Sequence, residues 1–268
     1  MKKPTNYHPI NSNQIRTLKL IYKFRFITLE QLRLYKHEKS LTGVYRTIKS
    51  LEDQGYIDSK YSRSYKLLGK GARYYLSAKG IKYLKQEKGI NHDVLHSMYK
   101  NKSVSETFID HNLDVFSALL SLRSQYPDTF TFFTKYEIAG YDYFPKPAPD
   151  LYLKRSSPET NSTNHYLLDI FSDSQFFVIK KRFDIYLEHF ETGDWESVNK
   201  SVYPTLLFVC PNARLEDRLN KHMERILDSA GIDDLFIYTS TTNTLLKSDS
   251  INTSIWSSVY EPEKLRSL

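Results

Sequence analysis

Four polar side chains share one face of a helix predicted between Ser40 and Gly55. The apolar residues of this segment recur at helical spacing, at Leu41, Val44, Ile48 and Leu51. The opposite face carries Thr42, Tyr45, Arg46 and Lys49. A helix can read base edges in the major groove of DNA when its exposed face offers hydrogen-bond donors of this kind. These four residues are therefore predicted to contact a nucleic acid.

Positive charge is concentrated around that helix. Residues 1–90 hold 20 Lys and Arg against 6 Asp and Glu, a net charge of +14, whereas the rest of the chain holds 18 against 25, a net charge of −7. One concentrated block of positive charge predicts a polyanionic partner. We expect the N-terminal part to face double-stranded DNA.

Signals for three helices and two strands surround this face. An apolar stripe predicts a first helix over residues 13–26, and Thr28 with Gln31 forms a capping box that starts a second. The third helix ends at Gly55, after which a strand begins, a Gly-Lys-Gly turn follows at 69–71, and then an aromatic strand. This arrangement resembles the winged helix-turn-helix family over about 75 residues.

The resemblance implies a hairpin wing beside the DNA backbone. Five cations would lie on or beside it and neutralise phosphates: Lys60, Arg63, Lys66, Lys70 and Arg73. With about five to seven phosphate contacts, the logarithm of the binding constant would fall against that of the salt concentration with a slope of roughly −5 to −6. Two alternatives stay open: the cations solvate the surface, or the domain binds a protein.

Length and composition favour two domains in a cytoplasmic protein. A chain of 268 residues can bury two cores, and a polar stretch places the boundary near residue 90, giving domains 1–90 and 91–268. The one cysteine, Cys210, fits a reducing compartment. We see neither a signal-peptide pattern nor an apolar run that approaches the roughly 18 residues of a membrane span.

The second domain is predicted to be an α/β/α sandwich with a mixed central sheet. A long helix is expected over residues 103–124 and two more over 174–191 and 212–230. Strand-like segments are expected at 130–138, 148–154, 165–171, 205–210 and 235–239. Strands alternating with helices in this order indicate an α/β class.

That order is similar to the PD-(D/E)xK, or restriction-endonuclease-like, fold. The resemblance implies that Asp150, in a Pro-Asp pair, and Asp169 hold Mg²⁺ at adjacent strand ends, with Glu106 or Asp110 as a further acid. Phe171 stands where the family has its lysine, so Lys180 or Lys181 on the next helix would replace it, and the catalytic set becomes Asp150, Asp169 and Lys181. The alternatives are a vestigial site and aspartates that merely cap a turn or helix.

The whole layout resembles the replication-relaxation family of plasmids and other mobile elements. The resemblance rests on the winged helix, the Pro-Asp strand, the Leu-Leu-Asp strand at 167–169 and the basic helix that follows. It implies a DNA-binding protein of replication, relaxation or mobilisation, acting as a homodimer or with replication or mobilisation proteins. The family is expected to carry an acid-x-acid pair on the third strand, whereas this chain has Asp169-Ile170-Phe171. Because the second acid of that pair and the lysine of the nuclease pattern are missing, we expect the second domain to serve assembly or partner recruitment.

Two further functions stay open, and several classes are excluded. The alternatives are a Mg²⁺-dependent DNA nickase using Asp150 and Asp169, and a transcriptional autoregulator. The chain lacks a Gly-x-x-x-x-Gly-Lys-Ser/Thr loop for ATP, a His-x-His pair of the rolling-circle relaxase kind, and the paired cysteines of a zinc finger.

Overall fold

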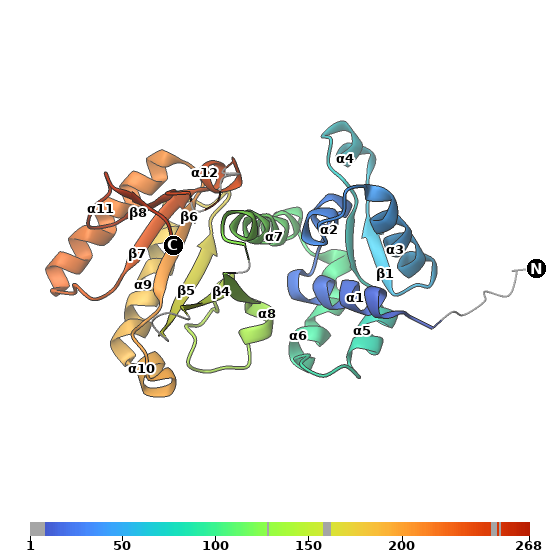
Figure 1. Cartoon of the computed structure of the whole chain (residues 1–268), viewed down its shortest axis with the longest axis horizontal. Coiled ribbons are helices and arrows are strands. Elements are labelled where there is room, and N and C mark those ends of the chain that lie inside the picture. The colour runs from blue at the N-terminus through green and yellow to red at the C-terminus, as the bar shows by residue number, and fades with distance from the viewer. Residues whose placement is uncertain (1–8, 128, 158–161, 248–250, 252) are drawn as a thin grey trace, which may run out of the picture. The chain divides into compact units, whose positions relative to one another are not determined.

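The computed structural model describes residues 9–127, 129–157, 162–247, 251 and 253–268 (Figure 1). The chain divides into two compact units, residues 1–116 and 117–268. The division falls inside a long helix, α7 (Glu106–Gln125), rather than near residue 90. Residues 91–116, which the sequence assigned to the second domain, thus lie in unit 1.

Three helices open unit 1: α1 (Ser12–Phe24), α2 (Leu29–Tyr35) and α3 (Leu41–Asp53). The first two begin with capping boxes in which Asn11 pairs with Gln14 and Thr28 with Gln31. Each box satisfies two backbone N–H groups that the first turn of a helix leaves without partners. The box at Thr28 is the one predicted from the sequence.

An antiparallel hairpin of β1 (Ile57–Lys60) and β2 (Arg73–Leu76) follows α3. A short helix, α4 (Arg63–Leu67), lies in the connection between these strands. Ile27, just before α2, forms an isolated bridge to Tyr74 of β2. This bridge ties the hairpin to the start of the second helix.

The rest of unit 1 packs against the hairpin and first helix. It comprises α5 (Ala78–Leu84), α6 (His92–Ser97), the 3₁₀ helix η1 (Met98–Ser103) and the first part of α7. Phe26, Tyr75 and Ile109 form a buried cluster. Nearby, the rings of Phe24 and Phe116 stack with centroids 4.1 Å apart. The beginning of α7 therefore belongs to the core of unit 1.

Unit 2 is built on one seven-stranded sheet whose strands follow sequence order. The strands are β3 (Phe130–Thr134), β4 (Leu151–Ser157), β5 (Ser162–Ile170), β6 (Thr205–Cys210), β7 (Ile237–Thr241), β8 (Trp256–Ser258) and β9 (Leu265–Arg266). Only β5, β6 and β7 pair in parallel, and the other neighbours are antiparallel. The prediction of an α/β fold with a mixed sheet is confirmed.

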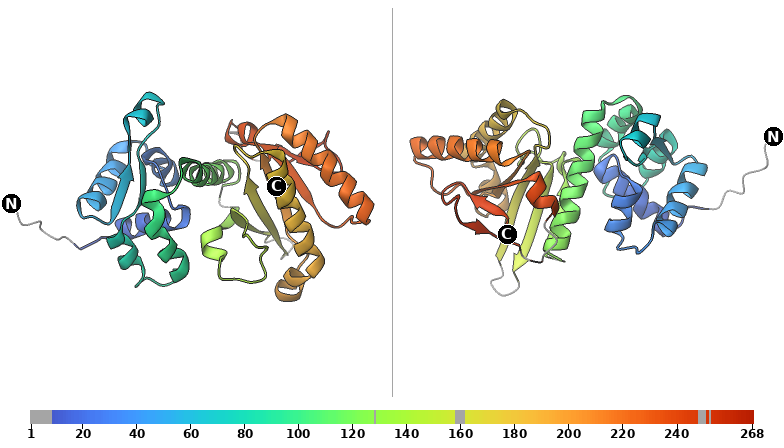
Figure 2. Two further views of the ribbon diagram at one scale, coloured as in Figure 1. Left: turned by 180° about the vertical axis from the view of Figure 1, so that it is seen from behind. Right: turned by 90° about the horizontal axis from the view of Figure 1, so that it is seen from above.

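Helical connections join the parallel strands. They contain α9 (Phe176–Thr192) with the short α10 (Asp194–Asn199), between β5 and β6, and α11 (Ala213–Ala230), between β6 and β7. Two more short helices, α8 (Lys135–Ile138) and α12 (Thr242–Lys247), lie between antiparallel strands. Figure 2 shows α9 and α11 beside the sheet. Their buried residues, such as Phe183 and Met223, share a core with Leu206 and Phe208 of β6. Alternate residues of β6 therefore face this helical layer.

Cys210 at the end of β6 is completely buried in that core. Burial raises the pKa of its thiol to about 12. Within the described residues, no helix is long and apolar enough to cross a membrane.

Candidate functional sites

The polar face of α3 is exposed, as its spacing predicted. Val44, Ile48 and Leu51 are buried, and they fix the orientation of the helix on its core. The predicted contact residues lie on the other side, where all four are exposed: Thr42, Tyr45, Arg46 and Lys49. This face therefore offers hydroxyl, guanidinium and ammonium donors to a ligand.

Lys49 also makes an ion pair within α3. Its Nζ lies 2.8 Å from Oδ1 of Asp53, one helical turn on. The hydrogen bond and the charge of Asp53 raise the pKa of Lys49. Because both side chains are largely exposed, such a pair is weak and can exchange for another anion.

The five cations predicted to contact phosphates divide into two groups. Arg63 and Lys66 are exposed on α4. The other three bind acceptors within unit 1: Lys60 donates to the carbonyl of Val104 at 3.2 Å, and Lys70 and Arg73 bind Asp110 at 3.0 and 2.7 Å. The side chain of Arg73 is only 3% exposed, so it supports the hairpin from inside.

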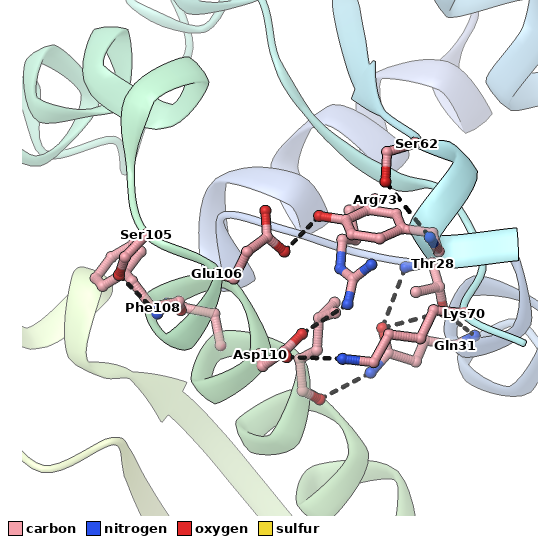
Figure 3. A network of polar contacts seen from close by, with 12 residues as sticks. Thr28, Gln31, Ser62, Lys70, Arg73, Ser105, Glu106, Phe108 and Asp110 are labelled. Atoms are coloured by element: carbon pink, nitrogen blue, oxygen red, sulfur yellow. Dashed lines mark hydrogen bonds and ion pairs between the residues drawn. The ribbon is translucent and has the colours of Figure 1, made fainter. Parts of the chain in front are cut away.

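A polar network joins the hairpin to α7 (Figure 3). The hydroxyl of Tyr65 in α4 donates to Glu106, and the guanidinium of Arg73 lies 3.9 Å from the centre of the Tyr65 ring. Burial and the bond to Glu106 raise the pKa of Tyr65 to about 12, which keeps the phenol protonated. Burial alone would raise the pKa of Asp110, but the hydrogen bonds from Arg73 and Lys70 hold it below its usual value. Glu106 and Asp110 thus hold the hairpin.

In unit 2, Asp150 and Asp169 lie side by side, as the sequence suggested. Asp150 directly precedes β4, and Asp169 lies in β5, its neighbour in the sheet. Oδ1 of Asp169 accepts from the backbone N–H of Asp150 at 3.0 Å, and Oδ2 of Asp150 accepts from the backbone N–H of Ile170 at 3.1 Å. Each carboxylate therefore fixes the backbone of the other strand.

Two cations neutralise this buried pair. Nζ of Lys135, at the start of α8, lies 2.8 Å from Oδ1 of Asp150. Nε of Arg182, on α9, lies 2.5 Å from Oδ2 of Asp169. Burial alone would lower the pKa of Lys135, but the charge of Asp150, its hydrogen bond and the further charges of Tyr136 and Asp169 together outweigh burial and raise the pKa. Tyr186, one turn beyond Arg182, also donates to Oδ2 of Asp169, at 2.8 Å.

This arrangement does not fit Mg²⁺. A divalent cation takes several oxygen ligands and is favoured by negative charge, whereas each oxygen of both carboxylates already accepts from an N–H, ammonium, guanidinium or hydroxyl group. The described part of the chain also contains no group of three or more His, Cys, Asp or Glu that could hold a metal ion. The expected lysines, Lys180 and Lys181, are exposed. Their neighbour Arg182 reaches the carboxylates instead.

Sequence reasoning missed Arg182, Tyr186 and Lys135 as partners of the aspartates. A signal existed for the first two, because Ile179, Arg182, Phe183 and Tyr186 recur at i, i+3, i+4 and i+7 on the buried face of α9. Lys135 gave no such signal, since it lies in a four-residue helix that only tertiary contacts place beside Asp150.

The fold and its polar clusters define an α/β protein with a basic, mainly helical unit and a mixed-sheet unit. The family model for replication-relaxation proteins matches residues 18–132, which confirms the resemblance to that family seen in the sequence. No curated protein gave a significant match. Among solved structures, the chain is similar to restriction endonuclease FokI, with 12% identity and a TM-score of 0.33 over 92% of this chain and 45% of that one. The chain thus spans less than half of FokI.

Proposed function

We propose that this protein binds double-stranded DNA through unit 1, in the replication, relaxation or mobilisation of a plasmid or another mobile element. The observation that carries the proposal is the exposed polar face of α3 on the most basic part of the chain. The similarity to the replication-relaxation family, over residues 18–132, supports the same setting.

A winged helix is the interpretation that best accounts for unit 1. Three helices precede the β1–β2 hairpin, and the bridge between Ile27 and Tyr74 ties that hairpin to the start of α2. In this interpretation α3 lies in the major groove and the hairpin is the wing. Arg46 and Lys49 would meet base edges, while Arg63 and Lys66 on the wing meet phosphates.

Unit 2 would serve assembly or the recruitment of a partner rather than chemistry on DNA. Asp150 and Asp169 are balanced by Lys135 and Arg182, and their hydrogen bonds join β4, β5, α8 and α9. In this interpretation the two aspartates stabilise the fold of unit 2 rather than bind a substrate or metal. One such assembly would be a homodimer that places its two α3 helices on the two halves of a palindromic DNA site.

Binding of a mixed-sequence duplex to the full chain tests the DNA proposal. Replacing Arg46 and Lys49 together by alanine should weaken binding by about 30-fold or more, since each good base contact contributes about 1–3 kcal/mol and every 1.4 kcal/mol is a factor of about ten. The matched control removes Lys85 and Lys88, two exposed cations outside α3 and the hairpin, and should change affinity much less. Wild-type binding should also weaken steeply as salt rises. Equal affinity of the R46A/K49A variant and the wild type would show that α3 does not read DNA.

A nicking assay tests the role of unit 2. Supercoiled plasmid incubated with the protein and Mg²⁺ or Mn²⁺ should stay supercoiled. Nicks that appear with the wild type and vanish with Asp150→Ala would overturn the assembly role and establish a nickase.

A further inference from the structure

Two leucines project from the hairpin next to each other. Leu67 is 81% exposed and Leu68 is 68% exposed, at the end of α4 and directly after it. Single exposed apolar residues are common on proteins. Two adjacent leucines at this exposure form a small apolar patch within an otherwise polar segment. The proposed function gives them no role so far.

The leucines lie in the tip of the hairpin, residues 62–70, in which hydrogen bonds cap both ends of α4. Ser62 caps the start of α4 by accepting from the backbone N–H of Tyr65. At the other end the N–H of Lys70 donates to the carbonyl of Tyr65 at 2.8 Å, and that of Gly69 to the carbonyl of Lys66 at 3.2 Å. With Gly69 at a φ of 64°, this is a Schellman ending. The leucines therefore stand on backbone that is already ordered.

The base of the tip is also anchored (Figure 3). Tyr65 points inward, 8% exposed, and bonds to Glu106 while Arg73 covers its ring. Arg73 in turn binds Asp110. Tyr65 is thus held from two sides. Side chains that insert into a ligand need a rigid support of this kind, and Tyr65 provides it for the neighbouring leucines.

The charge around the tip indicates the ligand. Residues 57–73 contain five Lys and Arg and one acid, Asp58. Arg63 and Lys66, on the same short helix as Leu67, are exposed. A protein partner for an apolar tip would have to match these two exposed cations, whereas the DNA backbone offers a phosphate at every step.

We propose that Leu67 and Leu68 form an apolar wedge that enters the minor groove of duplex DNA and partly unstacks a base step, while Arg63 and Lys66 hold the flanking phosphates. Proteins that insert apolar side chains in this way kink the duplex and recover the cost of unstacking through the larger surface that bent DNA contacts. The wedge would favour flexible pyrimidine–purine steps such as TA over stiff A-tracts. This inference rests on the DNA binding proposed above.

The test uses the full chain and a short duplex with a central TA step, a fluorescent dye at each end, and 2-aminopurine in place of the adenine of that step. Wild-type protein should increase energy transfer between the ends and raise 2-aminopurine fluorescence. The L67A/L68A variant should lose both signals while its affinity falls by no more than about tenfold. The control V198A/V202A removes two exposed apolar residues of unit 2 and should retain both signals. Circular dichroism checks that both variants are folded.

The outcomes separate this inference from the proposed function. Wild-type binding without bending, or bending that survives L67A/L68A, overturns the wedge and leaves DNA binding intact. No wild-type binding to any duplex at low salt overturns both. A change of oligomeric state in L67A/L68A with bending unchanged assigns the leucines to a protein contact and also overturns the wedge.

Discussion

Arg182 is the residue on which the buried charges of unit 2 depend most. It is 8% exposed and binds Asp169, the carbonyl of Pro147 and the hydroxyl of Tyr186. Removing one partner of a buried pair leaves the other charge without compensation and costs about 3–5 kcal/mol. Arg182→Ala should therefore lower the free energy of unfolding of unit 2 by that amount.

Urea unfolding followed by tryptophan fluorescence measures this effect, since both tryptophans, Trp195 and Trp256, lie in unit 2. The matched control is Lys181→Ala, which removes the exposed cation next in sequence and should change the free energy by less than about 0.5 kcal/mol. Similar losses in both variants would contradict the ion-pair geometry.

The two aspartates and their partners show which single residues of this cluster can be predicted from the sequence. The adjacency of Asp150 and Asp169 follows from their places at the ends of neighbouring strands, which sequence patterns reveal. Their neutralisation does not follow, because it depends on which side of α9 faces the sheet. Lys181 and Arg182 are adjacent in the sequence but lie about 100° apart around the helix, so one is exposed and the other is buried.

Among the elements, α5 approaches the backbone just before β1 unusually closely at Gly80. A Cβ built on Gly80 would lie 2.1 Å from the carbonyl oxygen of Tyr56, and backbone atoms cannot move aside cheaply. Gly80→Ala should destabilise unit 1 by about 1–3 kcal/mol through this overlap. Thermal unfolding followed by circular dichroism should show a lower midpoint.

Gly43→Ala is the matched control for that substitution. Gly43 lies within α3, and nothing stands within 4 Å of its would-be Cβ. Alanine there should stabilise the helix by about 0.5–1 kcal/mol, because glycine loses more backbone freedom on folding. Opposite shifts in the two variants are expected, and a stable Gly80→Ala protein would exclude the close approach.

Local signals predicted the elements they control directly. The capping box at Thr28, the stripe of α3 and the apolar run of β6 are each complete within a few residues, and each was predicted where it occurs. The short helix α4 was not predicted, because its formation depends on burying Tyr65 beside Arg73. The edge strands β8 and β9, of three and two residues, are too short to show a periodic pattern.

For the whole molecule, the beginning of α7 determines where unit 1 can be cut. Ile109 is completely buried with Phe26 and Tyr75, and Phe116 stacks on Phe24. A fragment of residues 1–90 lacks these partners, whereas residues 1–125 retain all of α7. Burying one large apolar side chain contributes about 1.5–3 kcal/mol, so the shorter fragment should be less stable by several kcal/mol.

Thermal unfolding of the two fragments by circular dichroism measures this difference. We expect a cooperative transition for residues 1–125 and a broad transition at lower temperature for residues 1–90. Equal midpoints would mean that α7 is dispensable for unit 1. A DNA-binding assay on residues 1–90 alone would then be a fair test of α3.

Cys210 makes this chain convenient for optical labelling. A completely buried thiol with a pKa of about 12 presents almost no thiolate at neutral pH, so maleimide or disulfide reagents should react with it only when the end of β6 opens. Dyes can therefore be attached at cysteines introduced on α3 or the hairpin without first removing a native thiol. The labelling rate of Cys210 itself then measures how often the sheet opens locally around β6.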